Sequence, residues 1–227
     1  MKIIVFDLGG TLMQYVGMPL SWVDFYEQGF ESIIQKYGGN VSKEDVDKSL
    51  QILKEFNPRV NYREVEYPAE HIFAKALEHW SMEAPLEGCI ETFWQGLKLT
   101  AEIYPDTIEV LQRLKEEGYI IATLTDLPNA MPDKVFQKDI SELLDYFDYY
   151  VSSSIAGYRK PHIQGLQMIS DKYSVPVTEL VFVGDEEKDR KTATNAKCRF
   201  IHIRRTEASG ESISNLYELL EILIKGK

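Results

Sequence analysis

The sequence has little cysteine and no long apolar run. Cys89 and Cys198 are its two cysteines, and their separation matches no metal-ligand spacing, so we interpret both as ordinary thiols of a reducing compartment. No stretch approaches the roughly 18 apolar residues of a membrane helix. Asp7 interrupts the first apolar run after four residues, unlike a secretory signal. We therefore expect a soluble, cytoplasmic protein.

Positive charge is also scarce. The chain has 25 Lys and Arg against 36 Asp and Glu, a net charge of -11. This balance disfavours nucleic acid or an anionic membrane as the main partner, because both attract basic surfaces. It leaves a small phosphorylated metabolite possible as a partner, since the local charge in a cleft decides whether an anion binds. The oligomeric state is not indicated.

Short apolar runs predict the strands of a buried parallel sheet. The runs lie at residues 3–6, 119–124 and 180–183; a last short strand is predicted at 199–203, and a weaker candidate lies at 146–151. Such runs, bounded by turn residues, are typical of strands buried on both faces. Helical patterns alternate with them, which implies right-handed crossovers. The predicted fold class is α/β, a Rossmann-like parallel sheet with helices on both faces.

The pattern is different between residues 14 and 99. Apolar and aromatic residues recur there at helical spacing, and a capping box at residues 42–45 opens one of the helices. No convincing strand occurs in this block. We therefore predict two domains: an α/β core formed by residues 1–15 and 100–227, and an all-helical domain formed by residues 16–99.

Polar side chains follow three of the predicted strands. They are Asp7, Thr125 and Asp185, and the carboxyl ends of parallel strands meet at one edge, so we expect them to converge. Lys160 lies just before a predicted helix, and residues 185–189 are rich in carboxylates. Each feature alone has an ordinary explanation as a turn, a helix cap, a solvated lysine or a helix first turn. Their order and spacing together indicate a site.

These segments resemble the motifs of the haloacid dehalogenase-like hydrolase superfamily, whose members are mostly phosphatases with an aspartate nucleophile. The family pattern is a strand ending in Asp-x-Asp-x-Thr, a strand ending in Thr or Ser, a Lys often followed by Pro, and a strand ending in Gly-Asp with another Asp shortly after. The matching residues are Asp7 to Thr11, Thr125, Lys160-Pro161, and Gly184-Asp185 with Asp189. The helical block lies where the family inserts a helical cap domain.

The resemblance implies a Mg²⁺-dependent phosphohydrolase of a small phosphorylated metabolite. Asp7 would be the nucleophile and form an aspartyl-phosphate. Thr125 would hydrogen-bond a phosphoryl oxygen, and Lys160 would neutralise charge. Hard cations take oxygen ligands, and the implied metal-site residues are Asp7, Gly9, Asp185, Glu186 and Asp189. The implied phosphate-binding residues are Gly10, Thr11, Asp126 and Arg159.

Gly9 departs from the family pattern. Family phosphatases usually carry Asp there to protonate the leaving group, and general acid–base assistance is typically worth about 10²–10⁴-fold. Three alternatives follow: a phosphatase that tolerates the loss through a good leaving group or an acid from the cap or Glu186, a weakly active or inactive phosphate-binding or regulatory protein, and a haloacid dehalogenase. The retained acidic cluster favours the first, because family dehalogenases do not need a metal. A second departure is Asp126, where the family often has Asn.

Specificity would reside in the helical block, where we would look first at Trp22, Tyr26, Arg59, Tyr62, Arg63 and His71. The helical spacing of the aromatic residues favours a packing role, and a solvated or salt-bridged state is the default for the arginines. The four histidines show no metal-binding spacing, so we interpret each as structural.

Overall fold

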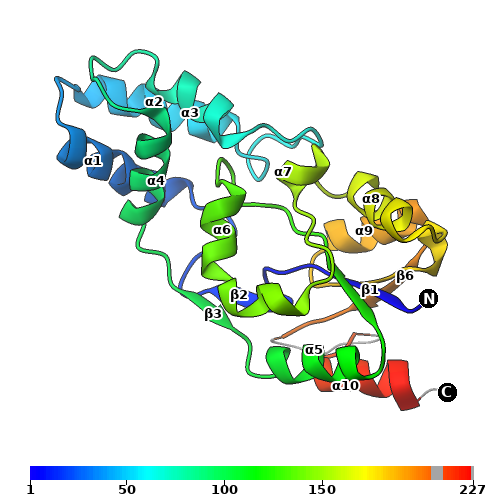
Figure 1. Ribbon diagram of the computed structural model, residues 1–227. Coiled ribbons are helices and arrows are strands. Elements are labelled where there is room, and N and C mark those ends of the chain that lie inside the picture. Colours follow the sequence, from blue (N-terminus) through cyan, green and yellow to red (C-terminus); the bar gives the residue numbers. More distant parts are fainter. Residues whose placement is uncertain (206–211, 226–227) are drawn as a thin grey trace. The chain divides into compact units, whose positions relative to one another are not determined.

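A computed structural model describes residues 1–205 and 212–225, which form two compact units (Figure 1). The first comprises Met1–Gln14, Ala101–Asp126 and the described part of Asp139–Lys227; the second comprises Tyr15–Thr100 and Leu127–Lys138. Residues 206–211 and 226–227, which fall in the predicted core domain, lie outside the described residues. Among the described residues, no helix has the length and apolar character needed to cross a membrane.

A four-stranded parallel sheet forms the centre of the α/β unit. Its strands are ordered β4 (Ile120–Thr123), β1 (Ile3–Phe6), β5 (Val181–Gly184) and β6 (Arg199–His202). All four residues of β1 are buried, as expected for a strand with neighbours on both sides and helices on both faces. The four main predicted strands are therefore present, and their boundaries differ from the predicted ones by at most one residue.

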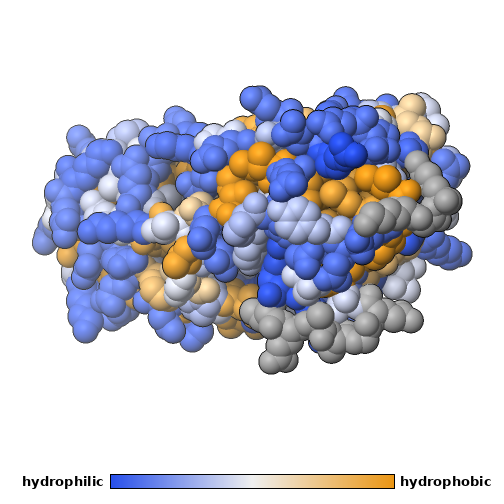
Figure 2. Space-filling model, turned by 90° about the horizontal axis from the view of Figure 1, so that it is seen from below, coloured by the Kyte–Doolittle hydropathy of each residue, from blue (hydrophilic) through white to orange (hydrophobic). Residues whose placement is uncertain are grey.

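Helices cover both faces of this sheet (Figure 1). On one face, Leu166 and Ile169 of α8 (Gln164–Tyr173) and Ala193 of α9 (Glu187–Ala196) pack with Val5 and Phe182 in the core. The opposite face carries α5 (Thr107–Glu116) and α10 (Leu216–Leu220), which continues as a π-helical turn, Glu221–Lys225. Viewed from that side, apolar side chains gather between polar ones on this unit (Figure 2). The predicted α/β class with a parallel sheet and helices on both faces is confirmed.

The weaker strand candidate at residues 146–151 is wrong. A 3-10 helix occupies Ser141–Tyr146, and the chain then makes only isolated bridges to the β4 segment, at Tyr149 and Ser152. The side chain of Asp148 interrupts the ladder, because its Oδ2 accepts the backbone N–H of Ile121 at 2.8 Å. An apolar run therefore lies beside β4 without becoming a strand.

Several short elements are not indicated by the sequence pattern. Strands β2 (Met13–Tyr15) and β3 (Ala101–Ile103) pair where the chain leaves the α/β unit and returns to it. Short helices α6 (Asp133–Asp139) and α7 (Ser153–Ala156) follow β4. Elements of three to seven residues are too short to establish a hydrophobic period.

The second unit is built from four helices: α1 (Tyr26–Tyr37), α2 (Lys43–Glu55), α3 (Ala69–Leu77) and α4 (Leu86–Gly96). The Phe93 ring of α4 lies at its centre, with ring centroids 5.0 Å from those of Phe30 and Phe73 and 5.8 Å from that of Tyr26. Segment Leu127–Lys138 packs with these helices, since the Trp94 indole N–H donates to the Ala130 carbonyl at 3.1 Å. The sequence pattern does not indicate that residues 127–138 belong to the helical unit.

Candidate active site

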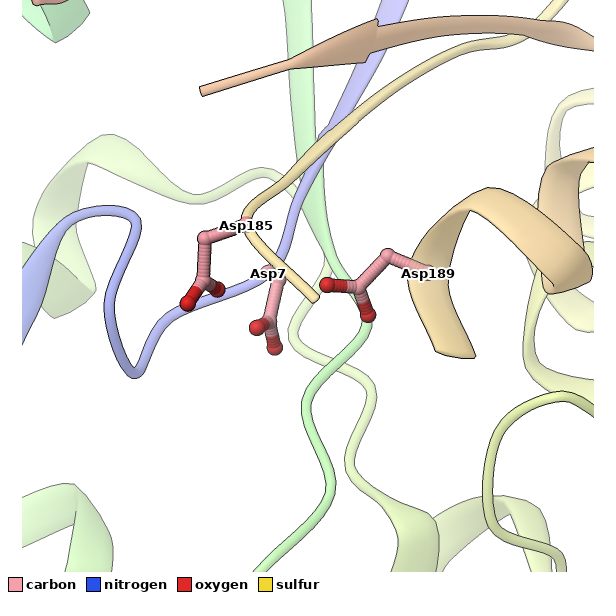
Figure 3. Close-up of side chains that lie close together, drawn as sticks. All are labelled: Asp7, Asp185 and Asp189. Atoms are coloured by element: carbon pink, nitrogen blue, oxygen red, sulfur yellow. The ribbon is translucent and has the colours of Figure 1, made fainter. Parts of the chain in front are cut away.

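Three carboxylates meet at the carboxyl edge of the sheet. Asp7 follows β1 and its backbone N–H donates to the Val183 carbonyl at 2.9 Å, while Asp185 directly follows β5 and Asp189 lies in the first turn of α9. Their side chains point toward one another (Figure 3), and each offers an oxygen within 4.8 Å of the others. Parallel strands thus bring together residues that are far apart in the sequence.

The Lys160 ammonium lies among these carboxylates. Its Nζ is 2.7 Å from Asp7 Oδ1 and 2.5 Å from Asp189 Oδ1, and only 1% of the side chain is exposed. Burial alone would lower the pKa of Lys160, but Asp189 and Asp7 outweigh burial and raise it. Lys160 is therefore a fixed positive charge beside Asp7.

One lysine does not balance two buried carboxylates and a half-buried one. Burial raises the pKa of Asp7 well above its ordinary value; Lys160 opposes this rise, and Asp189 and Asp185 add to it. Burial, followed by Asp189 and Glu186, raises the pKa of Asp185 to about 6. Three close oxygen donors with unbalanced negative charge suit a hard divalent cation such as Mg²⁺. By this test of charge and donor chemistry, the residues present fit the metal that the family implies.

The loop after β1 is shaped around Asp185. Gly10 has a φ of +78°, and a β-carbon built there would lie 2.2 Å from Asp185 Oδ2. Thr11 is fully buried and its hydroxyl donates to Asp185 Oδ1 at 3.2 Å. Of the four predicted phosphate-binding residues, Thr11 therefore contacts the Asp185 carboxylate and Gly10 leaves the space that this carboxylate occupies. Gly9 differs, because it is exposed and a β-carbon there would meet no atom within 4 Å.

Thr125 leaves the sheet beside Asp7. The Leu124 N–H donates to the Phe6 carbonyl at 2.9 Å, so the residues that follow, Thr125 and Asp7, leave neighbouring strands side by side. Thr125 is 2% exposed, and both its backbone groups are hydrogen-bonded, to Val151 and Ser153. Within the described residues, its hydroxyl has no hydrogen-bond partner. This hydroxyl is therefore available to a ligand.

Asp126 belongs to a second charged group next to Lys160. Its Oδ1 accepts the backbone N–H of Lys160 at 3.0 Å, and its Oδ2 lies 3.2 Å from the Lys188 ammonium. Burial alone would raise the pKa of Asp126, but Lys188, Arg159 and Lys160 outweigh burial and hold it well below its ordinary value. Asp126 is thus an ionised acceptor that fixes the Lys160 backbone. Arg159, also buried, contributes charge to the same group.

Lys188 is a site residue that sequence reasoning missed. Its ammonium is shared between Asp126 and Glu186, lying 3.3 Å from Glu186 Oε1. Asp189 completes the start of α9, where its Oδ2 accepts the Glu186 backbone N–H at 2.8 Å. The available signal was a lysine inside an acidic run, which is also the pattern of an ordinary solvated helix start.

Arg205 is a second residue that sequence reasoning missed. Its guanidinium donates to both carboxylate oxygens of Asp106, at 2.8 and 2.7 Å, and to the backbone carbonyl of Thr11. It also lies over the Tyr104 ring, 4.1 Å from the centroid. Arg205 therefore anchors the loop that carries Gly10 and Thr11. No sequence pattern predicts that an arginine after the last strand will anchor this loop.

The four histidines have structural contacts. The Nε2 atoms of His202 and His79 lie 2.9 and 2.8 Å from the carbonyl oxygens of Asp185 and Asp45. His162 accepts the Gln164 N–H through Nδ1, and His71 stacks on Tyr67. Among the described residues, the group that could hold a metal contains no histidine.

The residues singled out in the helical block have packing or pairing partners. Tyr26 is buried against Phe93, and Trp22 packs edge-on against Tyr15. Arg63 pairs with Glu66 at 2.9 Å. Further hydrogen bonds involve the Arg59 backbone N–H, the Tyr62 hydroxyl and the Trp22 indole. The packing interpretation of Trp22 and Tyr26 and the salt-bridge interpretation of Arg63 therefore agree with the structure.

Comparison with known proteins adds to this geometry. A sequence model of hydrolases described as haloacid dehalogenase-like matches residues 1–197. The phosphoglycolate phosphatase of Vibrio vulnificus (strain YJ016) is 26% identical and covers 98% of this chain and 96% of its own. That of Vibrio cholerae serotype O1 is 25% identical, covering 94% and 89%.

Solved structures share the fold. An HAD phosphatase from Thermococcus onnurineus has a TM-score of 0.65 at 22% identity, covering 99% of this chain and 98% of its own. A 2-haloacid dehalogenase from Pseudomonas syringae pv. tomato DC3000 has a TM-score of 0.71 at 20% identity, covering 100% and 99%. A phosphatase and a dehalogenase are both similar, so the fold alone does not select the chemistry.

Proposed function

The chain belongs to the haloacid dehalogenase-like hydrolase family, and from this premise we propose that it is a Mg²⁺-dependent phosphohydrolase of a small phosphorylated metabolite, with Asp7 as nucleophile. The observation that carries the proposal is the charge around Asp7. The Lys160 ammonium lies 2.7 Å from Asp7, and the three carboxylates of Asp7, Asp185 and Asp189 carry more negative charge than this one lysine balances. The phosphatase relatives support the same chemistry.

The metal would be held by this chain's oxygen atoms. Asp7 and Asp185 are the proposed carboxylate ligands, with the backbone carbonyl of Gly9 as a third, and with Asp189 and Glu186 acting through water. When bound, Mg²⁺ would neutralise the negative charge that Asp7 and a phosphate dianion bring together. Burial raises the pKa values of Asp7 and Asp185, and neighbouring carboxylates add to the rise; this supports the assignment, because a bound cation would offset both effects.

The remaining site residues have proposed roles set by charge and position. Asp7 would attack phosphorus as the bond from phosphorus to the substrate's leaving oxygen breaks, and water would then hydrolyse the aspartyl-phosphate, releasing phosphate and the Asp7 carboxylate. Lys160 neutralises Asp7 and the phosphate, and the Thr125 hydroxyl donates to a phosphoryl oxygen. Asp126 and Arg159 support Lys160 through the charged group they share, and Gly10 and Thr11 shape the Asp185 side of the site.

We further propose that residues 16–99 act as a cap domain on a core of residues 1–15 and 100–227. The family inserts such a domain after the first strand, and the compact helical unit begins at Tyr15. The cap would select the substrate.

Phosphate release with and without Mg²⁺ tests the function. Purified protein is assayed on p-nitrophenyl phosphate and on a panel of small phosphates, in Mg²⁺ and in EDTA, with halide release from a 2-haloacid measured in parallel. We expect Mg²⁺-dependent phosphate release that Asp7→Asn abolishes and that Asp47→Asn, a change at an exposed helix position, leaves intact. Metal-independent halide release would instead identify a dehalogenase. Binding of a beryllofluoride mimic without turnover would identify a phosphate-binding protein.

A further inference from the structure

The contacts of the described α/β-unit side chains around Asp7 place none of them to protonate a departing oxygen, and from this we propose a substrate class. We propose that the site cleaves phosphates whose leaving group departs as a stable anion, namely acyl phosphates, and that it cleaves alkyl phosphates poorly. This inference rests on the proposed phosphohydrolase function and narrows it.

Gly9 provides open space and no proton. A β-carbon at this position would meet nothing within 4 Å, so no neighbouring side chain fills the place that a side chain of residue 9 would take. Gly9 is also exposed, two residues after the nucleophile. Residue 9 therefore has open space beside it and no acid to offer.

The nearby carboxyl groups act as acceptors. Asp126 is held ionised, with its oxygens on the Lys160 backbone N–H and the Lys188 ammonium. Asp189 accepts the Glu186 N–H and faces Lys160, and Asp185 accepts the Thr11 hydroxyl. The carboxylate oxygens named here already accept a hydrogen bond or face an ammonium, so these contacts do not place a carboxyl proton toward a departing oxygen.

The nearby cations hold their protons. Lys160 shares its ammonium between Asp7 and Asp189, and Lys188 shares its ammonium between Asp126 and Glu186. Arg159 is a guanidinium, which does not deprotonate in proteins. The Nε2 of His202 donates to the Asp185 backbone carbonyl. None of these described side chains of the α/β unit is therefore placed as a general acid for a departing oxygen.

An acyl phosphate needs no general acid. The Asp7 carboxylate forms the new bond to phosphorus, the bond from phosphorus to the leaving oxygen breaks, and its electron pair leaves as a carboxylate whose conjugate acid has a pKa of about 4. Water then adds hydroxyl to the phosphoryl group, Asp7 is released as a carboxylate, and one proton passes to solvent. An alkyl phosphate would have to expel a strongly basic alkoxide, which general acid catalysis normally assists by about 10²–10⁴-fold.

The test compares leaving groups in the wild type and in Gly9→Asp. With Mg²⁺ present, kcat/KM is measured for acetyl phosphate, p-nitrophenyl phosphate, glycerol 3-phosphate and 2-phosphoglycolate, with Asp7→Asn as the blank. For each substrate, the ratio of kcat/KM in Gly9→Asp to kcat/KM in the wild type cancels that substrate's intrinsic reactivity. Gly9→Asn is the matched control, because Asn has nearly the shape of Asp and no acidic proton. Thermal unfolding confirms that each variant is folded.

We expect the wild type to hydrolyse acetyl phosphate and to be slow on both alkyl phosphates. Gly9→Asp should raise kcat/KM for the alkyl phosphates by about 10²-fold and change acetyl phosphate little, whereas Gly9→Asn should give no such rise. Efficient wild-type hydrolysis of the alkyl phosphates would overturn the inference and leave the proposed function standing, with a proton donor elsewhere. An equal response to Asp and Asn would also overturn it. Hydrolysis of neither class would overturn the proposed function itself.

Discussion

A β-carbon on Gly10 would lie 2.2 Å from Asp185 Oδ2, closer than two such atoms can approach. Gly10 also has a φ of +78°, in the left-handed region. Gly10→Ala should therefore destabilise the fold by about 1–2 kcal/mol from backbone strain alone, and displacement of Asp185 should weaken Mg²⁺ binding as well. Urea unfolding and calorimetric titration with Mg²⁺ measure the two effects. Gly9→Ala is the matched control and should stay within about 0.5 kcal/mol of wild type. Equal losses in both variants would contradict the steric argument.

Lys160→Met should cost both activity and stability. The variant leaves Asp7 and Asp189 buried without their ammonium, and removing one partner of a buried ion pair typically costs about 3–5 kcal/mol. Loss of a positive charge at the developing phosphoryl charge should lower kcat by about 10²–10³-fold. Both are measured on purified protein, by urea unfolding without metal and by phosphate release with Mg²⁺.

The stability loss in Lys160→Met should depend on pH. Lys160 lowers the pKa of Asp7, so its removal raises that pKa further above the ordinary carboxyl value. A carboxyl group whose pKa is raised by folding favours the folded state below its unfolded pKa, and that stability is lost as pH rises through the folded pKa. The variant should therefore be more destabilised at about pH 8 than at about pH 5. The same loss at both values would contradict this account.

The strands and the sheet edge could be predicted because burial leaves a continuous signal in the sequence. Residues 3–6 and 180–183 are apolar throughout, since neighbouring strands and helices surround them, and the polar residue that ends each run marks the edge. Run 146–151 is interrupted by Asp148 and makes only isolated bridges to the β4 segment. The Asp148 side chain accepts the Ile121 N–H, and no periodic pattern records such a bond.

The polar pairs that complete the site could not be predicted for a related reason. Lys188 pairs with Asp126, and Arg205 reaches Thr11 across 194 positions of sequence. A contact between single polar residues from distant segments has no period and no fixed spacing. Sequence reasoning could place Asp126 near the site, but it could not determine whether its charge was balanced. The Lys188 ammonium supplies that balance.

The pairing of Asp126 with Lys188 can be measured by a double-mutant cycle. Lys188→Met should destabilise the protein, because it leaves the buried Asp126 carboxylate without its ammonium. Adding Asp126→Asn removes the unpaired charge, so the double variant should recover part of both stability and kcat/KM. We expect a coupling free energy of about 0.5–3 kcal/mol from urea unfolding. Additive effects would show that the two residues act independently.

Mg²⁺ affinity should fall in mildly acidic solution, because Asp185 must be ionised to bind a cation and its pKa is raised to about 6. This raised pKa stabilises the metal-free fold below the ordinary carboxyl range, and that contribution is lost as pH rises through about 6. Mg²⁺ would compensate the buried negative charge and the repulsion from Asp189 and Glu186 that cause the loss, so the Mg²⁺-induced rise in Tm should be larger at about pH 8 than at about pH 5. Differential scanning fluorimetry with and without Mg²⁺ measures it. Asp185→Asn should remove the pH dependence and Asp47→Asn should keep it. A rise in Tm that is independent of pH in the wild type would mean that Asp185 does not bind the ion.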